Sequence, residues 1–151
     1  MWRVILILVL FLSLNTSFSQ TVIEMASPLD ANIILVWGSE AEHKDALFIK
    51  NNTKNTQVSP KLSLTQLTAL IDSVDLIIGN DTGPTHIAWA MNKASITLFG
   101  PTPASKMMWE TKLNISIESE SVVNPLKLNR SDMSIKEILP ESIYEKAKGL
   151  L

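Results

Sequence analysis

The hydrophobic and polar positions of the chain follow two alternating patterns. Short continuous apolar runs, typical of strands buried on both faces of a sheet, are followed by segments whose apolar residues recur at helical spacing. The apolar runs span residues 32–37, 74–79 and 95–99, with a weaker one at 113–117. This alternation predicts an α/β fold: a Rossmann-like parallel sheet with helices on both faces.

Local signals place helices between these strands. Ser63 and Gln66 have the spacing of a capping box, which predicts a helix that runs to about residue 73. Pro84 suits the first turn of a helix after the 74–79 strand, because its missing N–H costs nothing there. The other predicted elements are a helix over residues 41–52, a short strand at 57–58 and a closing helix over residues 140–148.

The N-terminal pattern is different. Arg3 precedes an apolar run over residues 4–12, and small residues stand three and one positions before a candidate cleavage point after Ser19. This arrangement is typical of a signal peptide, and the run is too short for an ordinary transmembrane helix. The alternatives are a first buried strand or a chain whose true start lies elsewhere.

Composition narrows the function classes. The 151 residues are 46% hydrophobic and 19% charged, which suits one ordinary folded domain, and the net charge of −2 does not suit a nucleic-acid binder. There is no cysteine, which excludes disulfides and thiolate zinc sites, and the two histidines, His43 and His86, lie in no metal motif. Dinucleotide, Walker and esterase motifs are also absent. Trp37 and Trp89 are candidates to stack on a base, although packing is the commoner role.

Parallel sheets bind ligands beyond the carboxyl ends of their strands, which selects the loops at residues 38–42, 80–86 and 100–104. The second loop is the most informative, because a helix starts within it and its first N–H groups form a natural diphosphate cradle. Gly83 would let a phosphate approach the backbone, and Thr82 and Thr85 add hydroxyl donors.

Each candidate also has a purely structural interpretation. Asp81 or Thr82 would cap a helix, and His86 would be a surface histidine. Glu42, beyond the first of these strands, would either hold ribose hydroxyls in the same crevice or simply favour a helix N-terminus, and the local residues favour the latter. The loop at Gly100 would either end a strand or present amides to a ligand.

Four motifs in combination point to a known family. They are Val-Trp-Gly-Ser-Glu-Ala-Glu at 36–42, Leu-Ser-Leu-Thr-Gln-Leu at 62–67, Asp-Leu-Ile-Ile-Gly-Asn-Asp-Thr-Gly-Pro-Thr-His-Ile-Ala at 75–88, and Leu-Phe-Gly-Pro-Thr at 98–102. Over residues 31–109 the chain resembles glycosyltransferase family 9, and within it the lipopolysaccharide heptosyltransferases of type I. The tail resembles the family loosely.

The resemblance implies the C-terminal domain of a GT-B fold, in which two Rossmann-like domains face a cleft. The family transfers heptose from ADP-heptose to the Kdo inner core of bacterial lipopolysaccharide, inverting the anomeric centre without a tightly bound metal or other cofactor. By position, Glu42 would hold the donor ribose and Asp81 would contact the heptose. Thr82 and Gly83 would place backbone amides on the diphosphate, and His86 would support the same site.

The chain also departs from the family. The N-terminal domain, which supplies the acceptor site and the base, has no counterpart, so no catalytic residue is assigned in this half. A family lysine that meets the donor is missing too. Residues 1–30 do not resemble the family, so we set them apart as a signal-peptide-like or non-native start, with the nucleotide-sugar-binding domain at 31–151.

Three hypotheses follow. The first is the donor half of a heptosyltransferase at the cytosolic face of the inner membrane, where ADP-sugars are used, despite the signal-like N-terminal segment. The second is a catalytically incomplete nucleotide-sugar-binding module from a truncated gene. The third is an exported structural protein whose motifs are coincidental, which predicts cleavage after Ser19.

Overall fold

The computed structural model describes residues 3–151 except 9–15, 101–102, 109 and 120–133. The described residues form a six-stranded parallel sheet with the strand order β3-β2-β1-β4-β5-β6. This confirms the predicted α/β fold with a parallel sheet. The strands are β1 (Val4–Leu8), β2 (Asn32–Val36), β3 (Thr56–Val58), β4 (Leu76–Asn80), β5 (Ser95–Phe99) and β6 (Asn114–Glu118).

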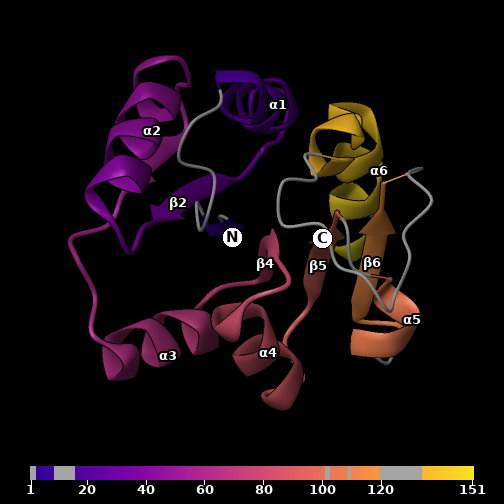
Figure 1. The fold of residues 1–151 in the computed structure, drawn as a ribbon. Helices are drawn as coiled ribbons and strands as arrows, with labels where there is room; N and C mark the ends of the chain where they lie inside the picture. The colour runs from indigo at the N-terminus through magenta and orange to yellow at the C-terminus, as the bar shows by residue number, and fades with distance from the viewer. Residues whose placement is uncertain (1–2, 9–15, 101–102, 109, 120–133) are drawn as a thin grey trace.

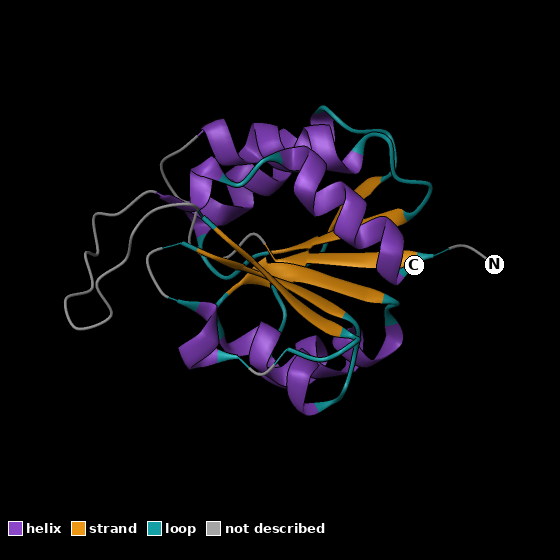
Figure 2. Ribbon diagram, turned by 90° about the vertical axis from the view of Figure 1, so that its right-hand side faces the viewer, coloured by secondary structure: helices purple, strands orange, loops and turns teal. Residues whose placement is uncertain are grey.

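Helices cover both faces of the sheet (Figures 1 and 2). One face carries α1, α2 and α6, and the other carries α3 and α4. Successive strand residues point to opposite faces, so Ile33 and Leu35 belong to the core under the first group, whereas Ile34 and Val36 pack under the second. The helices are α1 (Thr16–Ala26), α2 (Glu40–Asn51), α3 (Leu64–Ser73), α4 (Gly83–Ala90), α5 (Ala104–Met107), the 3-10 helix η1 (Ser134–Glu137) and α6 (Pro140–Leu150).

Residues 4–8 of the N-terminal apolar run form β1, a central strand of the sheet. β1 pairs in parallel with β2 and with β4, and Ile5 is fully buried. Ser19, at the candidate cleavage point, lies inside α1 and is buried. The separate segment expected over residues 1–30 is therefore not seen, because β1 and α1 pack within the same sheet and helix layer as the rest of the domain. A central strand buried on both faces has the same continuous apolar composition as a signal peptide. For this reason the sequence alone also fitted a signal peptide.

Most other predicted elements are confirmed with small shifts at their ends. β5 has the predicted bounds, whereas β4 begins at Leu76 because Val74 still caps α3. The capping box at Ser63 is present: Gln66 Oε1 accepts from the Ser63 N–H at 2.8 Å, and Ser63 Oγ accepts from the Gln66 N–H at 3.3 Å. The sequence analysis did not predict α5 or η1, which are only four residues long.

Candidate functional site

The strand order defines where a ligand would bind. The chain runs from β1 outward to β2 and β3, then returns to β4 on the other side of β1 and continues to β5 and β6. In such sheets the crevice lies beyond the carboxyl ends of the two strands at this switch, here β1 and β4. The loop after β1, residues 9–15, lies outside the described residues. The loop after β4 carries Asp81 and Thr82 and leads directly into α4.

Thr85 holds this loop in shape. It is fully buried, and its hydroxyl lies 2.7 Å from the carbonyl oxygen of Thr82 and 2.8 Å from that of Asn80. The same oxygen accepts from the Thr82 N–H at 3.1 Å. The expectation that Thr85 donates to a ligand is therefore wrong, because its hydroxyl is buried within the turn.

Gly83 leaves open space at the start of α4. Apart from its chain neighbours and its own helix backbone, no atom of the described residues lies within 4 Å of a Cβ added there, and the backbone does not adopt a positive φ. Packing and backbone conformation therefore do not require a glycine at this position. The described residues therefore leave room for a ligand next to the start of α4, as a diphosphate cradle needs.

The structure brings Asp81 and His86 together. His86 Nε2 lies 2.7 Å from Asp81 Oδ1, with 47% of the histidine side chain and 18% of the aspartate side chain exposed. The imidazole stacks on Trp89, with ring centroids 4.4 Å apart and 24° between the planes. Trp89 Nε1 donates to the hydroxyl of Thr97 at 3.2 Å. A partly exposed carboxylate is thus held in place at the start of α4.

Glu42 lies at the same edge of the sheet but has a structural role. It is buried, and its Oε2 accepts from the N–H groups of Gly38 and Ser39, each at 2.7 Å. Its own N–H donates to Ser39 Oγ at 3.3 Å, which completes a capping box at the start of α2. β2 and β4 are two strand spacings apart, about 10 Å. The ribose contact of Glu42 stays a prediction beside this observed cap.

Both candidate stacking tryptophans contact a histidine. Trp37 is buried, donates through Nε1 to the carbonyl of Ser59 at 2.8 Å, and stacks on His43 with centroids 4.1 Å apart. The sequence analysis missed Lys61, whose Nζ lies 5.8 Å from the centre of the Trp37 ring. The sequence offered one clue to Lys61: it follows the short strand predicted at 57–58. The loop after that strand lies at the same edge of the sheet as the other candidate loops.

The loop at Gly100 favours the structural interpretation in its described part. A Cβ on Gly100 would lie 3.1 Å from Cβ of Ile135, so a side chain there would crowd η1. The Gly100 carbonyl accepts from the Ser119 hydroxyl at 3.2 Å, and the N–H of Ala104 donates to Glu118 Oε1 at 2.8 Å. Residues 101–102 lie outside the described residues. Close packing thus accounts for the glycine without a ligand.

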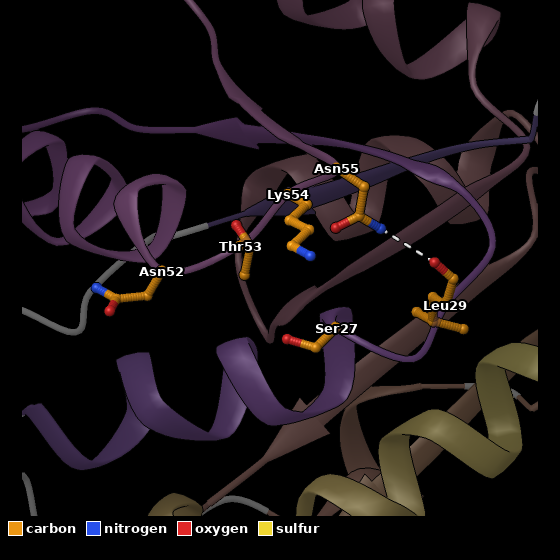
Figure 3. A pocket seen from close by; sticks show the side chains of 6 residues that line it. All are labelled: Ser27, Leu29, Asn52, Thr53, Lys54 and Asn55. Atoms are coloured by element: carbon orange, nitrogen blue, oxygen red, sulfur yellow. Dashed lines mark hydrogen bonds between the residues drawn. The ribbon is translucent and has the colours of Figure 1, made fainter.

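A cavity of about 400 Å³ lies at the opposite edge of the sheet, near the amino ends of β2 and β3 (Figure 3). Its polar side chains serve the fold. Asn55 Nδ2 donates to the carbonyls of Leu29 at 3.0 Å and Ala31 at 2.8 Å, and the hydroxyls of Ser27 and Thr53 each donate to a carbonyl one helical turn earlier. We therefore assign this cavity no ligand.

The described residues contain neither a metal-binding cluster nor a membrane-spanning helix. Among them, no group of three or more histidine, aspartate or glutamate side chains is arranged to hold a metal ion. Of the helices in the described part of the chain, none has both the length and the apolar character needed to cross a membrane.

Solved structures confirm the fold. An E. coli heptosyltransferase, WaaC with ADP, superposes with a TM-score of 0.77 at 15% identity, over 99% of this chain and 45% of that one. The same enzyme with ADP-2-deoxy-2-fluoro heptose gives a TM-score of 0.70 at 16% identity, over 97% of this chain and 43% of that one. At these identities the likeness concerns the fold alone.

Sequence relatives show the family. A lipopolysaccharide heptosyltransferase 1 of Campylobacter coli is 37% identical over 126 residues, which are 80% of this chain and 37% of that protein. One of Pseudomonas aeruginosa is 34% identical over 71 residues, 47% of this chain and 20% of that protein. The chain thus spans less than half the length of these relatives. Residues 16–129 match glycosyltransferase family 9 (heptosyltransferase), and the chain belongs to this family.

Proposed function

We propose that this chain is the donor-binding half of a lipopolysaccharide heptosyltransferase. It binds ADP-heptose for transfer of heptose, with inversion, to the Kdo inner core. The observation that carries the proposal is the Asp81–His86 pair beside the open start of α4, at the switch point of the sheet. The relatives named as heptosyltransferases, and the E. coli enzyme solved with ADP and with a fluorinated ADP-heptose, support the choice of donor.

The geometry suits the chemistry of the donor. Breaking the bond between sugar and phosphate leaves negative charge on ADP, and backbone N–H groups at the start of α4 stabilise that charge at the positive end of the helix dipole. Thr82 and Gly83 supply these amides, and the Thr82 N–H, which donates to Thr85 Oγ1 at 3.1 Å, exchanges that bond for one to the diphosphate. Asp81 orients the sugar hydroxyls and tolerates the positive charge that develops on the sugar, while His86 fixes the carboxylate. In this scheme the helix N–H groups stabilise the negative charge on ADP and Asp81 stabilises the positive charge on the sugar, so no metal is required.

The remaining parts of the reaction belong to a second domain. Inversion needs a base on the face of the sugar opposite the leaving ADP, and the acceptor needs its own site. The resemblance assigns both to the N-terminal domain of a GT-B enzyme, so the described residues are assigned donor binding alone. We place the protein at the cytosolic face of the inner membrane, in contact with the lipopolysaccharide inner-core acceptor through that domain.

A second candidate function is nucleotide-sugar binding without catalysis. The observation in its favour is that no candidate residue in the described part of the chain is placed as the base. This alternative predicts the same binding of ADP-heptose but no transfer of heptose when an acceptor-binding domain from a relative is added. Transfer by the reconstituted pair would exclude it.

Calorimetric titration of the full 151-residue chain tests the proposal. The whole chain is used because residues 4–8 form the central strand. We expect ADP-heptose to bind, ADP to bind more weakly, and UDP-glucose not to bind. A folded chain that binds none of the three, or that binds UDP-glucose as well as ADP-heptose, would contradict the proposal.

A further inference from the structure

Trp89 connects the carboxylate of the loop after β4 to β5 of the sheet. It lies three residues after His86 on α4, so the two side chains share one side of the helix. Asp81 pairs with His86, and the His86 ring stacks on Trp89. The Trp89 indole N–H in turn donates to the hydroxyl of Thr97 on β5. This arrangement goes beyond what capping of the helix requires.

His86 needs such support to keep its orientation. Because 47% of its side chain is exposed, little packing surrounds the imidazole, and an exposed side chain samples several rotamers. The stack on Trp89, at 4.4 Å between ring centroids, and the 2.7 Å contact with Asp81 together select one of them. Removing the stack would leave the Asp81 contact to fix the ring alone.

Trp89 is itself held firmly. Its N–H bonds to Thr97, which is fully buried and lies on β5, where it pairs with Gly79 of β4 and Ser116 of β6. The indole also packs against a small core cluster, which consists of Phe99, Ala104 and Met108. The orientation of the indole is therefore set by the sheet and not by the loop.

We propose that Trp89 is a positioning residue of the donor site, which holds the His86 ring where it pairs with Asp81 and so directs the carboxylate toward the sugar of the bound nucleotide sugar. This inference rests on the proposed function for its ligand. The contacts among Thr97, Trp89, His86 and Asp81 all lie within the chain, so the positioning itself is testable with no ligand added.

Two variants separate positioning from simple packing. Trp89→Leu keeps an apolar cover over the small core cluster but removes the aromatic stack on His86. Trp89→Phe keeps an aromatic ring for the stack and loses the N–H bond to Thr97. If Trp89 served packing alone, both variants would change stability and neither would change His86 or the selectivity for the sugar.

The first test measures the reaction of His86 with diethylpyrocarbonate by mass spectrometry, with His43, the other histidine, as internal control. Losing a hydrogen bond to a charged group raises the population of the unbonded, reactive imidazole about tenfold. We expect Trp89→Leu and Asp81→Ala to raise the rate at His86 about tenfold, with His43 unchanged, and Trp89→Phe to restore most of the protection. An unchanged rate at His86 in a folded Trp89→Leu variant would overturn the inference.

The second test compares the Kd values of ADP-heptose and ADP by calorimetry. We expect Trp89→Leu to lower the preference for ADP-heptose about tenfold while ADP binds as before, and Trp89→Phe to retain most of that preference. In the double variant with Asp81→Ala no further loss is expected, because both changes act through one carboxylate. Equal weakening of both ligands would overturn the inference. Failure of the wild-type chain to bind would instead refute the proposed function, and the labelling test would still decide on Trp89.

Discussion

At the scale of single residues, the loop after β4 divides its polar side chains between two tasks. Thr85 is buried and fixes the turn, whereas Asp81 and His86 are partly exposed and pair beside open space. Gly83 keeps that space open. The side chains that would meet a ligand are thus distinct from the one that holds the backbone, and the two roles are separable by substitution.

Thr85→Val removes the buried hydroxyl and keeps the shape of the side chain. The carbonyls of Asn80 and Thr82 then lose a donor inside the turn, so we expect the free energy of unfolding to fall by about 2 kcal/mol. Urea denaturation followed by circular dichroism measures this change. Thr85→Ser is the matched control, because it keeps the hydroxyl and should cost clearly less; equal losses would mean that the hydrogen bonds do not stabilise the turn.

Asp45 is expected to make stability depend on pH. Burial raises the pKa of Asp45 above its usual value of 3.8, and the nearby Glu42 carboxylate raises it further. Because the folded pKa lies above the unfolded one, folding favours the protonated form, and stability declines as the pH rises through these values. The charged form that dominates at neutral pH is therefore unfavourable in the folded protein.

Asp45→Asn should accordingly raise the urea midpoint at pH 7, and this gain should shrink toward pH 3, where the wild-type side chain is also neutral. The midpoints at the two pH values are compared with those of Asp72→Asn, an exposed position on α3. A gain of the same size at pH 3 and pH 7 would show that charge is not its cause.

At the scale of elements, the central position of β1 is the main departure from the sequence analysis. Two strands pair with it, β2 on one side and β4 on the other, and α1 packs against α2 and α6. The N-H of Val4 also donates to Asp75 Oδ2 at 2.8 Å, which ties the start of β1 to the segment that enters β4. β1 and α1 therefore contribute to the core, through Ile5 and through Val22, Met25 and Ala26.

Deletion of residues 1–19 should abolish folding of the domain. It removes β1 and the first residues of α1, and leaves β2 and β4 without the strand between them. Circular dichroism and size-exclusion chromatography of the truncated chain test this expectation. Leu47→Ala, at an exposed position of α2, serves as a control that should leave the fold intact. A truncated chain that still unfolds cooperatively would refute it.

Sequence patterns predicted the elements whose signals are local. Continuous apolar runs located β2, β4 and β5, and the spacing of Ser63 and Gln66 located the start of α3. The role of the first apolar run stayed open, because central strands and signal peptides share a composition. Strand order also depends on long-range pairing, which the local pattern does not encode.

The candidate site was predictable to a similar extent. Asp81 and His86 lie in one short loop, so the sequence alone suggested that they share a site. The links from His86 to Trp89 and from Trp89 to Thr97 were not predicted, because the latter joins α4 to β5 across the fold. The buried role of Thr85 was missed for the same reason, since its bonds depend on how the turn closes.

At the scale of the whole molecule, the order of the strands decides where the site lies. The chain reverses direction across the sheet between β1 and β4, and the loop with the Asp81–His86 pair lies at that reversal. The chain belongs to glycosyltransferase family 9 and spans less than half the length of the relatives it matches. The task that we propose for the described residues is to hold the donor.

The claim that the loop after β4 binds the donor is tested most directly by the Kd of ADP-heptose. It is measured for the 151-residue wild type, for Asp81→Ala and for Asp72→Ala. Asp72 is an exposed aspartate at the end of α3, which leads into the amino end of β4, away from the candidate site. We expect Asp81→Ala to weaken binding at least about tenfold, as the loss of a charged hydrogen-bonding partner implies, and Asp72→Ala to bind like the wild type. Equal affinity in all three folded proteins would contradict the claim that the loop after β4 binds the sugar of the donor.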